Sequence, residues 1–67
     1  MQITINKKIY NLDEHTTVNN VLTKLDLVSE NGIAVALNYA VVPRAKFDST
    51  YLKTGDVLEI IHATAGG

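Results

Sequence analysis

The stretch Val57-Leu58-Glu59-Ile60-Ile61-His62, which continues as Ala63-Thr64-Ala65-Gly66-Gly67, decides how the chain folds and how it ends. Residues 57–62 are largely apolar and predict a strand. The two final glycines lose more backbone entropy on ordering than any other residue and have no side chain to bury. We therefore expect a strand followed by a slim, flexible tail from about residue 64, which a partner could thread through a narrow channel. The alternative is an ordinary frayed terminus.

The composition is typical of a small globular domain. The chain has 67 residues, of which 46% are hydrophobic and 19% charged, so one domain over residues 1–67 is expected. The absence of cysteine excludes disulfides, thiolate metal sites and a cysteine nucleophile. The formal net charge of -1 offers no attraction to nucleic acid or to an anionic membrane. No apolar run is long enough for a membrane span or a signal peptide, so we expect a cytoplasmic domain.

Alternation of apolar and polar residues predicts most of the strands. Residues 1–6 alternate with period two and residues 8–12 do so less cleanly, which together indicate a β-hairpin with a tight turn at Asn6-Lys7-Lys8. A further strand is expected over residues 33–38. A short strand at Val41-Val42 ends at Pro43, because proline cannot donate to a ladder. Residues 45–52 have no clean period and are expected to hold one helical turn.

A single amphipathic helix is predicted between the hairpin and the third strand. Thr16 or Thr17 can cap its N-terminus, and apolar residues follow at helical spacing over residues 18–25. It should end near Leu27, before turn-forming residues that include Gly32. The predicted core consists of Ile3, Ile5, Val18, Val21, Leu22, Leu25, Val35, Leu37, Leu58 and Ile60. The element order predicts an α+β domain in which the first and last strands pair within a mixed sheet.

The parity of the last strand predicts a docking face for a partner protein. Glu59 and Ile61 share the face opposite to Leu58 and Ile60, and an unpaired charge is not expected in the core. Ile61 should therefore be exposed just before the tail. Ala34 and Ala36 should point outward from residues 33–37 and form a flat apolar floor around Ile61 if the two strands are neighbours. The alternative is that a single exposed isoleucine has no function.

No side-chain arrangement in the sequence indicates catalysis. His15 and His62 lack acidic partners at ligand spacing, so no metal site is expected. The carboxylates are scattered and suggest no acid and base pair, and no glycine-rich loop is suited to phosphate. We therefore expect a carrier or binding module with no catalytic residues and no bound cofactor, not an enzyme.

The sequence resembles the ThiS family, the sulfur carriers of thiamine biosynthesis. The resemblance rests on Asn38 with Val41-Val42-Pro43-Arg44, on Gly55-Asp56 before the final strand, and on terminal Ala65-Gly66-Gly67. It extends over essentially the whole chain. It implies the β-grasp fold, a ubiquitin-like architecture in which a mixed sheet of about five strands packs on one helix.

The resemblance also implies a function for the terminus. The α-carboxyl of Gly67 has a reference pKa of roughly 3.3–3.7, so at neutral pH it is an anion and a poor electrophile. A ThiF-like adenylating enzyme would activate it with MgATP, a persulfide donor protein would convert it to a thiocarboxylate, and a ThiG-like thiazole synthase would accept the sulfur. Ala65 and Gly66 would thread the partner's channel, and the chain would act as a co-substrate of these enzymes.

Three alternatives stay open at this point. The first is the sulfur carrier of molybdopterin synthesis, which uses the same terminal chemistry. The second is a ubiquitin-like modifier that is conjugated to lysine through Gly67. The third is a plain interaction domain, in which the terminus has no chemical role.

Overall fold

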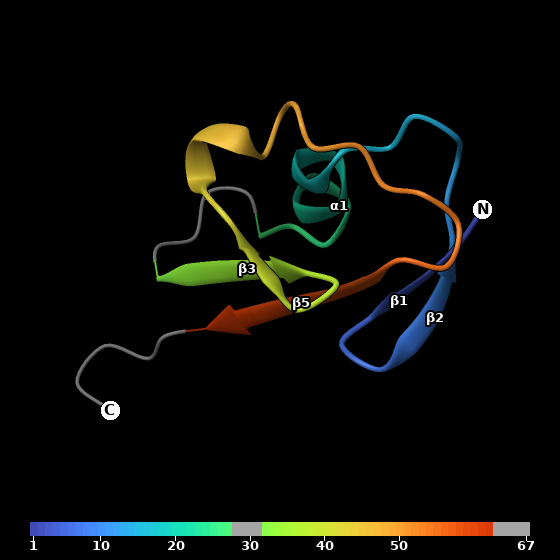
Figure 1. Ribbon diagram of the computed structural model, residues 1–67, viewed down its shortest axis with the longest axis horizontal. Helices are drawn as coiled ribbons and strands as arrows, with labels where there is room; N and C mark the ends of the chain where they lie inside the picture. Colours follow the sequence, from blue (N-terminus) through green and yellow to red (C-terminus); the bar gives the residue numbers. More distant parts are fainter. Residues whose placement is uncertain (28–31, 63–67) are drawn as a thin grey trace.

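One helix packs on a five-stranded mixed sheet (Figure 1). The computed structural model describes residues 1–27 and 32–62. In chain order the elements are β1 (Gln2–Ile5), β2 (Lys8–Asn11), α1 (Val18–Lys24), β3 (Ile33–Leu37), β4 (Ala40–Val42), the 3-10 helix η1 (Arg44–Lys46) and β5 (Val57–His62). The order across the sheet is β2-β1-β5-β3-β4. This arrangement confirms the predicted α+β class and mixed sheet.

Strand β5 lies at the centre of the sheet. It pairs in parallel with β1, where Thr4 is opposite Val57 and Ile5 is opposite Leu58. It pairs in antiparallel with β3 from Leu37 opposite Leu58 to Ile33 opposite His62. The predicted pairing of the first and last strands is therefore confirmed. Beyond Leu58, β5 continues beside β3 after β1 has ended (Figure 1).

Both hairpins turn through an asparagine with positive φ. Asn6 and Lys7 have φ values of 48° and 71°, and Asn38 and Tyr39 have values of 50° and 70°. Positive φ at both central residues is the pattern of a two-residue type I′ turn, whose twist matches that of the flanking strands. Asparagine suits the first position because its short polar side chain makes the left-handed conformation accessible.

The same two asparagines extend the ladders of β5 with their side chains. The Asn6 N–H donates to the Leu58 carbonyl at 3.0 Å, and its Oδ1 accepts the Ile60 N–H at 2.8 Å. The Asn38 N–H donates to the Val57 carbonyl at 2.7 Å, and its Oδ1 accepts the Val57 N–H at 2.9 Å. In a regular ladder the main-chain carbonyl of each asparagine would accept that second N–H. The amide oxygen takes its place where the backbone has entered the turn.

Helix α1 begins at Val18 and is capped by Thr17, one of the two predicted caps. The Thr17 Oγ1 accepts the Asn20 N–H at 3.1 Å, and the Asn20 Oδ1 accepts the Thr17 N–H at 3.0 Å. These reciprocal bonds form a capping box. The next two donors find partners in the loop after η1, because Val18 donates to the Thr50 carbonyl at 3.0 Å and Asn19 to the Phe47 carbonyl at 3.1 Å. The first N–H groups of the helix are thereby satisfied.

The predicted helix end near Leu27 is wrong, because α1 ends at Lys24. Asp26 takes a φ of 62° and donates its N–H to the Thr23 carbonyl at 3.0 Å. Leu27 then donates to the Leu22 carbonyl at 2.7 Å. This pair of bonds is a Schellman motif, which closes a helix when the residue after the cap is left-handed. Leu27 packs against the core after the helix has ended.

The core lies between α1 and the facing side of the sheet. Eight of the ten predicted core residues are buried, namely Ile3, Ile5, Val18, Val21, Leu22, Val35, Leu58 and Ile60, whereas Leu25 and Leu37 are partly buried and pack against them. Four further residues, absent from the predicted core, are also buried: Leu12, Ile33, Phe47 and Leu52. Phe47 and Leu52 lie in the loop that is bonded to the start of α1, where no periodic pattern marks burial. The helical turn that was expected within residues 45–52 lies at the start of that range and begins one residue earlier, at Arg44.

Truncation of a side chain under the helix should test this packing. Leu22→Ala is expected to lower the free energy of unfolding by about 2–5 kcal/mol, because it removes a buried side chain and leaves a cavity. Val41→Ala is the control, since Val41 is 76% exposed, and should cost less than about 1 kcal/mol. Urea denaturation measures both, and equal stabilities of the two variants would contradict the core assignment.

Replacement of the left-handed Asp26 at the helix end by glycine should stabilise the protein. Asp26→Gly is expected to raise the free energy of unfolding by about 1 kcal/mol, because a non-glycine residue is strained at this φ and a carboxylate is unfavourable at a helix C-terminus. Asp26→Asn removes only the charge and should give a smaller gain. Thermal unfolding of the variants at matched pH separates the two contributions. A loss of stability in Asp26→Gly would contradict the Schellman assignment.

Candidate functional site

The residues predicted to carry the chemistry lie beyond the end of β5. Ala65, Gly66 and Gly67 are outside the described residues, as is the flexible tail predicted from residue 64. Their roles stay predictions. The described part of the chain leads to them through β5, the most central strand of the sheet.

The residues of the predicted docking face lie together on the sheet. Ile61 is directly opposite Ala34, and Glu59 is directly opposite Ala36 in the antiparallel pairing of β5 with β3. Residues opposite one another in paired strands share a face. Ile61 is 53% exposed, whereas Ile60, which points the other way, is buried. The structure therefore places all four side chains on the face that α1 does not cover, while their role in docking stays a prediction.

This outer face includes more residues than the four of the predicted docking face. Its strand residues are Gln2, Thr4, Ile9, Asn11, Ala34, Ala36, Val41, Val57, Glu59 and Ile61. Val41 lies opposite Ala36 and is 76% exposed, and Ile9 lies opposite Thr4 and is 69% exposed. The sequence analysis missed both, because β2 and β4 are too short for a clear period. They could be found from strand pairing, because each lies opposite a residue of β1 or β3 that alternates with core residues.

Glu59 is the one charged residue among these ten outer-face positions. It is half-buried, lies between Val57 and Ile61 along the outer face of β5, and is opposite Ala36 of β3. A cation or a hydrogen-bond donor on a partner surface would complement this carboxylate.

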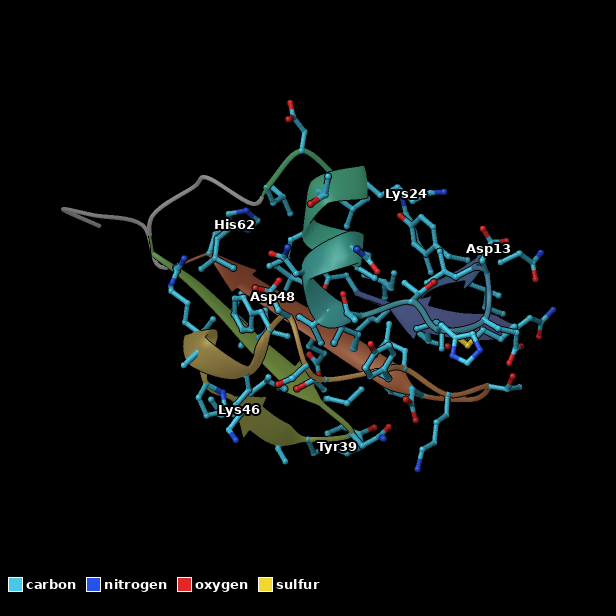
Figure 2. The ribbon with its side chains drawn as sticks, turned by 90° about the horizontal axis from the view of Figure 1, so that it is seen from above. Asp13, Lys24, Tyr39, Lys46, Asp48 and His62 are labelled. Atoms are coloured by element: carbon cyan, nitrogen blue, oxygen red, sulfur yellow. The ribbon has the colours of Figure 1, made fainter. Side chains whose placement is uncertain are left out.

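Tyr39 adds an aromatic side chain at the edge of the sheet. It is 82% exposed and lies in the turn between β3 and β4 (Figure 2). Its φ of 70° belongs to the type I′ turn, as does the φ of 71° of Lys7 in the other hairpin. Aromatic side chains of this kind are common anchors of protein interfaces.

The described residues hold no group of three or more histidines and carboxylates that could bind a metal ion. His15 is exposed in the loop before α1, and His62 is exposed at the end of β5. A hollow of about 320 Å³ lies beside that loop, with Asp13, His15 and Lys24 in its lining. Figure 2 shows Asp13 and Lys24 on one side of α1 and His62 on the other, so this hollow is remote from the end of β5.

The part of the chain that the structure describes has no helix that is both long and apolar enough to cross a membrane.

A family model described as the ThiS family matches residues 3–67. The chain belongs to the ThiS family. A crystal structure of the thiamine biosynthesis protein ThiS from Geobacter metallireducens is similar with a TM-score of 0.84 and 33% sequence identity, over 100% of both chains. An NMR solution structure of a thiamine biosynthesis protein from the same organism has a TM-score of 0.78 and 33% identity, over 100% of this chain and 88% of that one.

Two algal proteins are also similar along the whole chain. The protein ycf40 of Pyropia yezoensis is 37% identical over 67 residues, which is 100% of this chain and 93% of the relative. The protein ycf40 of Porphyra purpurea is 36% identical over the same lengths.

Membership of the ThiS family bears on both fold and role. The structural similarity confirms the β-grasp architecture that the resemblance implied. ThiS-family proteins are small carriers, so membership supports a role as a sulfur carrier that interacts with biosynthetic partner enzymes.

Proposed function

We propose that this protein carries sulfur for thiazole formation in thiamine biosynthesis, on the carboxylate of Gly67. The observation that carries the proposal is the match of a ThiS-family chain through residue 67, in which the centrally held β5 leads from the sheet into Ala65-Gly66-Gly67. The match and the ThiS-type neighbours favour this role over the molybdopterin and protein-modifier alternatives.

The proposed chemistry begins with activation of the terminus. A carboxylate oxygen of Gly67 attacks the α-phosphorus of MgATP in a ThiF-like adenylating enzyme, and pyrophosphate leaves. The resulting acyl-adenylate has a good leaving group, which the free carboxylate lacks. The carrier itself supplies no acid, base or metal ligand to this step, and MgATP belongs to the partner.

Sulfur then replaces AMP on the acyl carbon. The outer sulfur of a donor protein's persulfide attacks that carbon, AMP leaves, and an acyl disulfide joins the two proteins. A thiol attacks the donor's own sulfur, so that the donor becomes a disulfide and the carrier keeps a thiocarboxylate. A ThiG-like thiazole synthase takes the sulfur and returns the carboxylate. The carrier acts throughout as a co-substrate.

In this proposal the adenylating enzyme binds the part of the outer face that is formed by Ile61, Ala34, Ala36 and Glu59. Ile61 is the exposed apolar residue closest to the tail, and the small Ala34 opposite it lets a partner side chain approach. Glu59 adds one charge that selects the partner's orientation. Ala65 and Gly66 thread the channel, since they leave little or nothing beside the backbone to clash.

The terminus is tested by changing its length. Deletion of Gly67, or extension of the chain by one residue beyond it, should abolish sulfur transfer, because the carboxylate no longer reaches the site of adenylation. Unfolding should be unchanged, since Gly67 has no side chain to bury. Intact-mass measurement after incubation with the adenylating enzyme, ATP and a persulfide donor should show one oxygen exchanged for sulfur in the wild type alone. A deletion variant that accepts sulfur would exclude the proposal.

The docking face is tested by a pair of matched charge substitutions. Ile61→Asp should weaken binding to the adenylating enzyme by at least about 1 kcal/mol, as loss of a modest hot spot does, with little change in melting temperature. Ile9→Asp is the control, because Ile9 is similarly exposed on the same face but lies on the edge strand β2, with β1 between it and β5. Calorimetric titration compares the two. Equal affinities would place the docking surface elsewhere.

A further inference from the structure

We propose that the free edge of β2 pairs in antiparallel with the same edge of a second copy of this chain, so that the two sheets become continuous. This inference does not depend on the proposed function of the terminus. It starts from the position of β2, which is the outermost strand of the sheet beside β1 (Figure 1). An edge strand leaves half of its main-chain donors and acceptors without a strand partner, and another chain can pair with them.

The hydrogen bonds of the β1–β2 hairpin show which groups of β2 are directed outward. At the open end of the hairpin, the Met1 amino group donates to the Leu12 carbonyl at 2.7 Å, and the Leu12 N–H donates to the Met1 carbonyl at 2.8 Å. Bonded and non-bonded pairs alternate along an antiparallel ladder, so the residues of β2 that bond to β1 are the even-numbered ones. The N–H and C=O groups of Ile9 and Asn11 therefore point away from β1, toward the edge.

The opposite edge of the sheet is less suited to such pairing. Strand β4 has three residues, and Ala40 closes a two-residue turn, so it is bonded to β3. By the same alternation, Val41 is the one residue of β4 that directs its N–H and C=O outward. Pro43 follows β4 at once and has no N–H to offer.

The charges beside β2 make its edge complementary to itself. Lys7 and Lys8 lie at the turn end of β2, whereas Asp13 and Glu14 follow its other end, and all four side chains are exposed. In an antiparallel pair of β2 strands, the basic end of each copy meets the acidic end of the other. A parallel pair would bring like charges together, which is destabilising. This charge complementarity selects a second copy as the occupant and determines its direction.

The main-chain groups of β2 select the register. Opposite residues in a continuous sheet share a face, and the outward groups of Ile9 and Asn11 must meet those of the second copy. Both conditions are satisfied within β2 when Tyr10 lies opposite Tyr10 of the second copy. Ile9 of each copy then exchanges both main-chain hydrogen bonds with Asn11 of the other. A shift by two residues would need bonds from Lys7, in the turn, or from Asp13, after the strand.

This register also agrees with the charges and the side chains. It brings Lys7 to the level of Asp13 of the second copy, and it brings Lys8 within diagonal reach of Glu14, a separation that long side chains span. At the centre it pairs two half-buried tyrosine side chains across the contact, and cross-strand aromatic pairs stabilise a sheet.

The pairing leaves the predicted docking face accessible. Strand β1 lies between β2 and β5, so the contact is two strands away from Ile61. The sheet of the second copy would continue beside the first sheet and would not lie over its outer face. Each copy would therefore keep its own surface around Ile61 for a partner.

Reversal of the charges tests the proposal. Sedimentation equilibrium should show the mass of the wild type rising from monomer to dimer with concentration. The variants Lys7→Glu/Lys8→Glu and Asp13→Lys/Glu14→Lys each place like charges at both ends of the contact, and each should raise the dissociation constant about tenfold or more. An equimolar mixture of the two variants restores opposite charges at both ends and should form the dimer again. The chain with all four substitutions should do so by itself.

Proline substitution tests the main-chain bonds. Ile9→Pro removes an N–H that is directed outward and leaves the ladder to β1 intact, since proline is tolerated on edge strands with this orientation. Val41→Pro is the matched control, because it removes the outward N–H of the other edge. We expect the dimer to be lost in Ile9→Pro and kept in Val41→Pro. Amide hydrogen exchange of Ile9 and Asn11 should slow about tenfold or more as the wild type dimerises, and that of Val41 should not change.

Several results would overturn the proposal. One is a wild-type mass that stays at the monomer value up to about 1 mM protein. Another is a dimer that persists in both charge-reversal pairs or in Ile9→Pro. A dimer lost in Ile61→Asp and kept in the charge-reversal pairs would place the contact on the outer face instead. Renewed dimerisation in the mixture supports the proposal, because a general effect of net charge on association would not pair one variant with the other. None of these measurements involves the terminus, so their failure would leave the proposed function untouched.

Discussion

The structure depends above all on the pairing of β5 with strands on both sides. β1 holds it in parallel and β3 in antiparallel, and the two neighbours come from the start and the middle of the sequence. Each of their hairpin turns contributes an asparagine oxygen to the backbone of β5, at Ile60 and at Val57. The bonds compensate for the short length of β1 and β3, since a strand that ends in a turn withdraws its own carbonyl from the ladder. The register of the central strand is thus secured where the flanking strands stop.

The loop that follows η1 joins the helix to this sheet. Carbonyls of Phe47 and Thr50 accept the first N–H groups of α1, and Leu52 donates to the Thr16 carbonyl at 2.9 Å. The same loop buries Phe47 and Leu52 against the core. In a chain of 67 residues, which can bury only a modest fraction of its surface, this arrangement lets an irregular segment both close the core and cap the helix.

In the proposed function the folded domain binds the partner enzyme, while the chemistry takes place at the terminus and in the partners. One face of the sheet is covered by α1, and the other carries Ile9, Val41 and Ile61 exposed around small residues. In the proposed function a partner covers the part of this face around Ile61. In the proposed function this division allows one domain to present the same terminus to each partner enzyme.

The sequence by itself determined the element order, the two faces of β5 and membership of the family, because these follow from local periodicity and short motifs, and it narrowed the helix cap to Thr16 or Thr17. Parity alone sufficed to send Glu59 and Ile61 outward. Only the tertiary structure decided that α1 ends at Lys24, that Phe47 and Leu52 are buried, and that Asn6 bonds to Ile60. Each of these depends on the competition between local conformation and contacts with distant segments. A one-dimensional pattern records which residues repeat within an element, but it does not record which backbone groups a neighbouring element leaves without a partner.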